Sequence, residues 1–286
     1  MDNIETETIR RERYSMDSHL FAKKIRLYTL KELKNLGFGH IGGSLSIVEV
    51  LSVLFHEKIR LKEQKEKNRD MFILSKGHAG PAYYATLFLK GCFSEEFLYS
   101  LNTNGTKLPS HPDCNLTPMV DMTTGSLGQG ISVAAGVAYK YKTENIDANV
   151  YCILGDGEMN EGQIYEALQF ISHHKLNNLI LFIDDNKKQL DGYTKDICDQ
   201  LDYVSKMKSF GLYSERVDGH NVVEISKAID RAKEKDGATV IVLDTIKGKG
   251  APYFEEKLDN HHVRFTKEEL EILEQEIKQL EKEIGV

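Results

Sequence analysis

The chain has 286 residues, of which 41% are hydrophobic, so it is long enough to bury one large core. Its 44 acidic and 37 basic residues give a net charge of −7, which argues against nucleic acid or an anionic membrane surface as the main partner. No apolar run approaches the roughly eighteen residues that span a bilayer, and the N-terminus lacks the apolar core of a signal peptide, so we expect a cytoplasmic protein.

The beginning of the chain is strongly charged, and we expect residues 1–15 to be loose. Apolar residues at helical spacing predict a helix over 16–36, which ends at Gly37. Four glycines then frame His40 ahead of a second predicted helix over 47–56. A histidine before a helix N-terminus suits an anion, although a solvated loop histidine is the simpler interpretation of this residue alone.

A first strand is predicted over 71–74, and it leads into a glycine turn that carries Lys76 and His78. At the carboxyl end of a strand both side chains would face a ligand, as positive or hydrogen-bonding groups for phosphate. A helix follows over 82–89, and a later stiff turn carries a third histidine, His111.

A glycine-rich loop over 123–130 precedes a predicted helix over 131–141. Alanine and glycine make this helix thin at Ala134, Ala135, Gly136 and Ala138. Small residues allow close contact, so this helix is expected at a tightly packed subunit or sheet interface.

The next strand is predicted over 150–154, and it stops at Gly155-Asp156-Gly157 before a predicted helix over 161–174. A further apolar strand over 179–183 ends in Asp184-Asp185-Asn186. In a right-handed strand–helix–strand unit both carboxyl ends open on one edge of the sheet, so Asp156 and Asn186 can meet.

Asp156 and Asn186 offer one charged and one neutral oxygen, with backbone carbonyls nearby. This hard ligand set suits Mg²⁺ or Ca²⁺ carrying a phosphorylated ligand rather than zinc. A plain turn is the commoner interpretation of an aspartate between glycines. The second strand that ends in asparagine favours the metal site.

Beyond residue 192, helices over 200–210 and 223–232 alternate with strands over 213–217 and 239–244. This alternation, without internal repeats, predicts an α/β fold with one doubly wound, mostly parallel sheet and helices on both faces. The sequence has neither a dinucleotide-binding glycine pattern nor a P-loop. We expect a domain over 1–265 and a C-terminal helix over 266–286, which would dock on this domain or on a partner.

Four cysteines, Cys92, Cys114, Cys152 and Cys198, lie far apart without a CxxC pair. Their spacing indicates neither a disulfide framework nor a zinc site. They are most simply reduced packing residues.

From about Phe38 to Leu270 the motifs resemble, in order, the N-terminal half of transketolase, and specifically the separate short subunit found where that enzyme is split into two polypeptides. The matching motifs are GHIGGSLSIVEVL, FILSKGHAGPAYY, SHPD, TTGSLGQG, GDGEMNEG, DDNKKQLDG, VDGH and TIKGKG followed by NHH. The resemblance implies a thiamine diphosphate-binding fold of the diphosphate-domain type. It also implies transfer of a two-carbon ketol unit from a ketose, or ketose phosphate, to an aldose.

The resemblance assigns the metal site to Asp156, Asn186 and the backbone carbonyl of Lys188, which would ligate Mg²⁺, with Ca²⁺ or Mn²⁺ as substitutes. The residues that it places around the cofactor are His78, Gly125, Ser126, Leu127, Gly155, Gly157, Glu161, Leu190 and Lys247. Among them, Gly157 and His78 would contact the diphosphate, and Gly125 to Leu127 would line the aminopyrimidine. Leu190 would pack on the rings, Lys247 would lie beside them, and Glu161 matches a carboxylate at the subunit contact.

Family histidines that meet the sugar correspond to His40, His111 and His261. Histidine suits proton transfers to sugar hydroxyls, because both protonation states are accessible near pH 7. Two departures stand out: Lys187 replaces a common glycine, and Asn260-His261-His262 replaces an aromatic-His-Gly run. The second departure leaves the choice between His261 and His262 open.

The family activates its cofactor with a glutamate on a separate pyrimidine domain, for which 286 residues leave no room. The implied partner is a C-terminal transketolase subunit that carries this domain, in an α2β2 assembly, and the chain alone would be silent. The expected substrates are sugars or sugar phosphates, whose identity the family reads mostly from the other domain. The alternatives are a subunit of another thiamine diphosphate enzyme, similar to deoxyxylulose phosphate synthase or a keto-acid decarboxylase, and a non-catalytic cofactor-binding scaffold.

Overall fold

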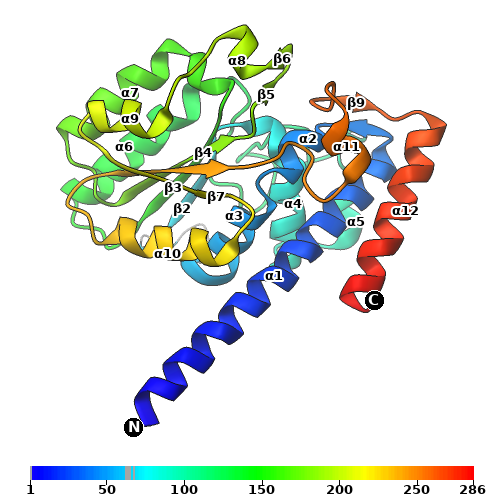
Figure 1. Cartoon of the computed structure of the whole chain (residues 1–286), viewed down its shortest axis with the longest axis horizontal. Coiled ribbons are helices and arrows are strands. Elements are labelled where there is room, and N and C mark those ends of the chain that lie inside the picture. Colours follow the sequence, from blue (N-terminus) through cyan, green and yellow to red (C-terminus); the bar gives the residue numbers. More distant parts are fainter. Residues whose placement is uncertain (1, 62–65, 67) are drawn as a thin grey trace.

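The computed structural model describes the backbone of residues 2–61, 66 and 68–286 (Figure 1). Within this range a five-stranded sheet has the order β2-β3-β4-β8-β7, and each neighbouring pair is parallel. Its strands are β2 (Met71–Leu74), β3 (Val150–Gly155), β4 (Leu179–Asp185), β7 (Tyr213–Asp218) and β8 (Thr239–Asp244). All five strands were predicted from the sequence, with bounds that agree within two residues.

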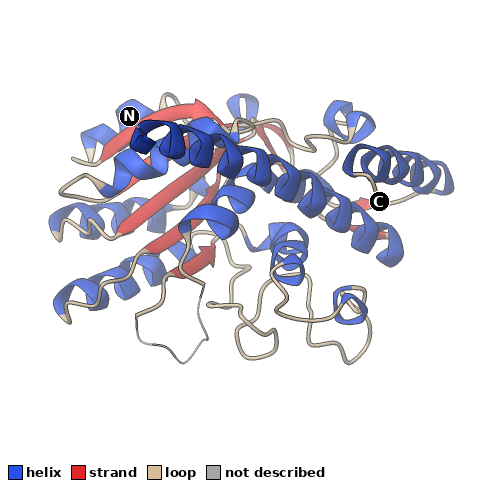
Figure 2. Ribbon diagram, turned by 90° about the horizontal axis from the view of Figure 1, so that it is seen from below, coloured by secondary structure: helices blue, strands red, loops and turns tan. Residues whose placement is uncertain are grey.

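Helices cover both faces of the sheet (Figures 1 and 2). One face carries α6 (Gln129–Thr143), α7 (Gly162–His173) and α9 (Tyr203–Ser209), and the other carries α1 (Asp2–Leu36), α3 (Val48–Val53), α4 (Gly80–Leu89) and α10 (Val222–Lys233). Alternate residues of β3 pack into opposite cores: Tyr151 and Ile153 face α1 and α4, whereas Cys152 and Leu154 face α6 and α7. The chain therefore has the predicted doubly wound α/β fold.

Short elements connect these layers. They are α2 (Ile41–Leu45), a π-helical turn (Leu54–Lys58), 3-10 turns (Gly77–Ala79 and Glu158–Asn160), α5 (Glu95–Leu98), α8 (Thr194–Ile197), α11 (Pro252–Glu256), and the antiparallel pairs β1 (Phe38–Gly39) with β9 (Val263–Arg264) and β5 (Lys188–Gln189) with β6 (Gly192–Tyr193). Apart from the turn Leu54–Lys58, which overlaps the helix predicted over 47–56, none of them is long enough to give a periodic pattern, so the sequence did not predict them.

The C-terminal helix α12 (Lys267–Ile284) docks on α1 of the same chain. It begins with the expected capping box, in which Thr266 and Glu269 each accept a hydrogen bond from the other's backbone N–H. Its apolar stripe buries Leu273 and Ile277, and Lys31 of α1 pairs with Glu281 at 2.7 Å. This stripe is therefore occupied within the chain.

Residues 1–15 were expected to be loose; α1 begins at Asp2, and this stretch is rich in the helix formers glutamate and arginine. Two other expectations need correction. The helix expected over 47–56 divides into α3 and the π-helical turn Leu54–Lys58. Cys198, expected to pack, is exposed, although all four cysteines are free as expected. No helix in the described part of the chain is long and apolar enough to cross a membrane.

Glu32 of α1 is a buried acid without a partner. Its side chain is fully enclosed, and neither carboxylate oxygen accepts a hydrogen bond. Burial raises the pKa of Glu32 well above its usual value. The folded chain therefore keeps a proton on Glu32 at pH values where the unfolded chain has lost it, so this residue makes the free energy of unfolding fall as pH rises above about 4.3.

Glu32→Leu should raise the free energy of unfolding at pH 8 by about 1–3 kcal/mol, because it removes an unsatisfied buried acid. The gain should shrink toward pH 4, where Glu32 is protonated in both states. Urea unfolding at several pH values measures this difference, with Glu271→Leu on the exposed face of α12 as the control. A gain that does not vary with pH would contradict the assignment.

Candidate functional site

The carboxyl edge of the sheet gathers most of the predicted site residues around a cavity of about 190 Å³. The predicted residues that line it are His78, Leu127, Gly155, Asp156, Gly157, Asn186, Lys188, Leu190, Lys247 and His261. Most of them lie at or just after the ends of β2, β3, β4 and β8, whose parallel arrangement brings these ends together. Five predicted site residues do not line this cavity: His40, His111, Gly125, Ser126 and Glu161.

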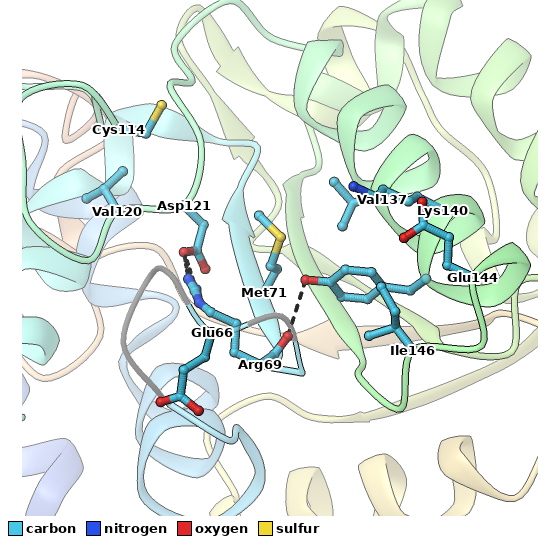
Figure 3. A pocket seen from close by; sticks show the side chains of 11 residues that line it. Glu66, Arg69, Met71, Cys114, Val120, Asp121, Val137, Lys140, Glu144 and Ile146 are labelled. Atoms are coloured by element: carbon cyan, nitrogen blue, oxygen red, sulfur yellow. Dashed lines mark hydrogen bonds and ion pairs between the residues drawn. The ribbon is translucent and has the colours of Figure 1, made fainter.

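A larger cavity of about 610 Å³ lies elsewhere, between the start of β2 and the C-terminal part of α6 (Figure 3). Its buried Arg69 pairs with Asp121, and the backbone carbonyl of Arg69 accepts a hydrogen bond from Tyr141. None of the predicted site residues lines it. Its size is therefore no argument for function.

Asp156 carries the one carboxylate of the proposed metal site. Its Oδ1 accepts the Gly157 N–H at 2.8 Å, but its buried Oδ2 has no partner. Burial and the nearby Asp184 raise the pKa of Asp156 to about 7. Lys76 and Lys247 act on this carboxylate without contacting Oδ2, and a cation bound at Oδ2 would neutralise it directly.

The available ligands fit a hard divalent cation. No cluster of three or more His, Cys, Asp or Glu side chains that could hold a metal occurs among the described residues. A cation beside Asp156 would depend on one carboxylate with amide and carbonyl oxygens, a set that suits Mg²⁺ or Ca²⁺. Lys188 N–H already donates to Asn186 Oδ1 at 3.1 Å, which leaves this oxygen one further lone pair.

Asp184 holds Asn186 in place. Its carboxylate accepts hydrogen bonds from Asn186 Nδ2 at 2.9 Å, from Ser46 Oγ at 2.7 Å and from Thr245 Oγ1 at 2.5 Å. Its fourth donor is Lys76 Nζ, and both members of this ion pair are at most 1% exposed. Since the amide nitrogen of Asn186 is bound to Asp184, its oxygen is directed the other way.

Lys76 therefore has a different role from the expected one. Its ammonium lies on Asp184 and on the carbonyl of Gly43, so it neutralises a buried carboxylate rather than offering a free charge to phosphate. Lys76 and Lys247 both line the cavity, and Lys247 Nζ donates to the Lys188 carbonyl at 3.1 Å. That carbonyl is the predicted metal ligand, and its second lone pair remains available.

Glu158 is a site residue that the sequence analysis missed. Its buried carboxylate accepts hydrogen bonds from Ser75 Oγ, Gly128 N–H and Gly155 N–H. It thereby joins the end of β2, the end of β3 and the glycine-rich loop. An acid directly after Gly-Asp-Gly was the available signal, but its partners are distant in sequence.

The glycine-rich loop packs against the turn after β2. A Cβ on Gly77 would lie 2.9 Å from the backbone nitrogen of Gly125, so the approach requires glycine. Leu127 lines the cavity, whereas Ser126 and Glu161 are exposed. Leu190 also lines the cavity and is 63% exposed, so both leucines add exposed apolar surface to its border.

Five histidines form a cluster beside the cavity. The His40 ring is at its centre, with centroids of His78, His111, His261 and His262 at 5.6, 5.6, 5.4 and 4.6 Å. The sequence predicted four of these residues, which come from widely separated turns. His220 of the VDGH motif lies apart and bonds Glu49 and the backbone of Ile246.

Four histidines of the cluster, His40, His78, His111 and His261, have a lowered pKa and are neutral near pH 7. Burial lowers the pKa of His40 to about 3, with the electrostatic effect of His262 as the next cause. Burial likewise lowers the pKa of His261 to about 3, with the electrostatic effect of Lys247 as the next cause. Burial also lowers the pKa of His78 and of His111. For these four residues the lowered pKa disfavours the charged form near pH 7, contrary to the expectation that both protonation states are accessible, because imidazoles and nearby lysines share one desolvated space.

The geometry separates His261 from His262. His261 lines the cavity, and its Nδ1 lies 3.2 Å from Lys247 Nζ. His262 is exposed and packs on His40 and Phe38. His261 is therefore the member of the pair that faces the metal side of the site.

Comparison with known proteins places this geometry in context. The family of the transketolase thiamine diphosphate-binding domain matches residues 17–284. Over 250 residues the chain is 47% identical to the 6-deoxy-6-sulfo-D-fructose transketolase subunit SqwG of Clostridium sp. (strain MSTE9), covering 86% of this chain and 91% of that protein. It is 34% identical to an apulose-4-phosphate transketolase subunit from Actinobacillus succinogenes, covering 84% of this chain and 88% of the other.

A solved structure is also similar. The transketolase of Campylobacter jejuni superposes with a TM-score of 0.83 at 29% sequence identity, over 96% of this chain and 43% of that one. The chain thus spans less than half of this single-chain relative, but most of the two shorter relatives.

The ion pair between Lys76 and Asp184 should be strongly coupled. Either Lys76→Met or Asp184→Asn should lower the free energy of unfolding by about 3–5 kcal/mol, because each leaves a buried charge alone. The double variant should lose less than the sum of the two. A double-mutant cycle by urea unfolding measures this coupling.

The matched control is the pair Lys58–Asp230, whose aspartate is 61% exposed and whose coupling should not exceed about 1 kcal/mol. Additive effects of Lys76→Met and Asp184→Asn would show that the two charges do not depend on each other.

Proposed function

The chain belongs to the family of transketolase thiamine diphosphate-binding domains, and we propose that it is the cofactor-binding N-terminal subunit of a two-chain transketolase. It would act in the transfer of a two-carbon ketol unit from a ketose to an aldose. The observation that carries the proposal is the buried, unpartnered oxygen of Asp156 beside Asn186 at the carboxyl edge of the sheet. The relatives that it matches over most of their length are transketolase subunits, so the other thiamine diphosphate reactions and the scaffold alternative are not favoured.

Asp156, Asn186 and the Lys188 carbonyl would hold Mg²⁺, which would bind the diphosphate. Gly157 supports this role, because a Cβ there would lie 2.9 Å from Cβ of Gln189, so only glycine allows this close approach of the backbone beside the metal ligands. When bound, thiamine diphosphate supplies a carbon nucleophile that also takes up the electrons of the cleaved C–C bond.

His40, His111 and His261 are suited to orient the sugar and to move its protons. Burial lowers the pKa of Lys247 to about 8, so it remains mostly charged at pH 7 and donates to Nδ1 of His261. His261 then carries its own proton on Nε2, from which it can donate to a sugar oxygen. The neutral imidazoles also add no positive charge that would oppose a bound cation.

The partner would be a C-terminal transketolase subunit with a pyrimidine domain, in an α2β2 assembly in which two-fold symmetry pairs the subunits. Exposed groups support such contacts. Leu190 and Leu127 are exposed at the border of the cavity, and Glu161 presents a carboxylate beside the glycine-rich loop. Gly136 of the thin helix α6 faces open space and borders a groove with α7.

Asp156→Ala and Asn186→Ala should each weaken Mg²⁺-dependent binding of thiamine diphosphate by at least about tenfold, because the diphosphate charge loses its metal bridge. Calorimetry in the presence of Mg²⁺ measures the affinity. Asp244→Ala is the matched control, since this carboxylate ends β8 on the same edge but is 55% exposed. Unchanged affinity in both site variants would refute the assignment.

A further inference from the structure

The motif VDGH at the end of β7 has no part in the proposed site, yet its histidine has a defined set of hydrogen bonds. Asp218 Oδ1 accepts the His220 N–H at 2.9 Å, and the Gly219 N–H donates to the Asp244 carbonyl at 2.9 Å. A Cβ on Gly219 would overlap Cγ2 of Thr245, so only glycine lets this turn pack against the end of β8. The motif therefore directs His220 toward the turn that follows β8.

The ring of His220 makes two hydrogen bonds, and they fix its tautomer. Its Nε2 accepts the Ile246 N–H at 2.8 Å, since a backbone amide can only donate. The proton of the neutral ring then lies on Nδ1, which is 3.1 Å from Oε2 of Glu49. The side chain of His220 is only 14% exposed, so water competes little for either bond. His220 thus connects a buried carboxylate to the backbone of the turn after β8.

Glu49 also binds a second group that holds the same turn. Its Oε1 pairs with Nη2 of Arg26 at 2.5 Å, and Nε of Arg26 donates to the Lys249 carbonyl at 2.9 Å. Burial raises the pKa of Glu49, but Arg26 and His220 oppose this effect, and the pKa lies below its usual value. The carboxylate is therefore charged near pH 7. Through its two partners it fixes the amide of Ile246 and the carbonyl of Lys249.

The backbone between these two anchors carries Lys247. Its side chain is buried, and Nζ donates to the Lys188 carbonyl at 3.1 Å and lies 3.2 Å from Nδ1 of His261. A lysine side chain loses much rotamer freedom when it is held in one conformation, so it keeps both partners only if its own backbone is fixed. The position of the turn therefore decides whether Lys247 can hold the predicted metal-ligand carbonyl and the sugar-facing histidine together.

We propose that His220 is a positioning residue for Lys247. By accepting the Ile246 N–H it holds the turn over 246–249 where Lys247 reaches the Lys188 carbonyl, and it thereby acts on the metal ligands from outside the cavity, which it does not line. This inference rests on the proposed function, in which that carbonyl binds Mg²⁺.

Three substitutions separate the two bonds of the ring. His220→Gln keeps an acceptor for the Ile246 N–H, because its side-chain carbonyl can reach the position of Nε2. His220→Asn is shorter, so it keeps a donor for Glu49 but no acceptor for Ile246. His220→Phe keeps the volume of the ring and loses both bonds. The control is His19→Phe, which changes an exposed histidine of α1.

The first measurement is the affinity of the reconstituted two-chain assembly for Mg²⁺ in the presence of thiamine diphosphate, by calorimetry. His220→Asn and His220→Phe should weaken it by about tenfold, the loss typical of an outer partner of a metal ligand. His220→Gln should retain most of the affinity, and His19→Phe should retain all of it. Urea unfolding shows that each variant folds.

The second measurement asks whether His220 acts through Lys247. Lys247→Met should itself weaken Mg²⁺ binding, and His220→Asn added to it should cause less than about twofold further loss, because the two residues act in one chain of contacts. A purely structural effect of His220 would instead add in full to that of Lys247→Met.

Hydrogen exchange at the Ile246 amide gives a readout that does not depend on the cofactor. Exchange should be faster in His220→Asn and His220→Phe than in the wild type, and close to the wild type in His220→Gln.

Full additivity with Lys247→Met, equal losses in His220→Gln and His220→Asn, or unchanged exchange at Ile246 would each overturn the positioning role while leaving the proposed function intact. A wild-type assembly that binds no thiamine diphosphate would instead refute the proposed function, and the role of His220 at the metal ligands with it.

Discussion

The buried ion pair between Lys76 and Asp184 is the interaction on which the carboxyl edge of the sheet depends. Lys76 follows β2 and Asp184 lies in β4, and the same carboxylate also accepts from Ser46, Thr245 and Asn186. One buried charge thus joins the ends of three strands and the turn after α2. Because an isolated charge in this position would be very costly, these contacts form together or not at all, and the ligand-facing edge is fixed before any ligand arrives.

The same edge leaves one charge uncompensated. Asp184 is satisfied by four donors, whereas Asp156 has a buried oxygen without a partner and a pKa raised to about 7. This contrast indicates a structural role for Asp184 and supports the ligand-binding role that we propose for Asp156. The histidines show a related division, since His261 faces Lys247 and the cavity while His262 lies at the surface.

The sequence predicted the five strands of the sheet because each is a compact apolar run bounded by turn residues. It also predicted that Asp156 and Asn186 converge, because parallel strands end on one edge. It did not predict the roles of Glu158 and Asp184, whose partners lie up to 138 positions away and leave no local pattern. The sequence also could not predict the protonation of His40 and His261, because their pKa values depend on burial in the folded chain and on Lys247.

The central claim is that this chain provides half of a transketolase active site. It carries the residues for the cofactor and the sugar, but the site is open beside the exposed Leu190 and Leu127. The most direct measurement is two-carbon transfer from a ketose to an aldose by the purified chain with thiamine diphosphate and Mg²⁺, with and without its partner subunit. The account predicts no turnover from the chain alone and transfer when the partner is added. Sustained turnover by the chain alone would contradict it.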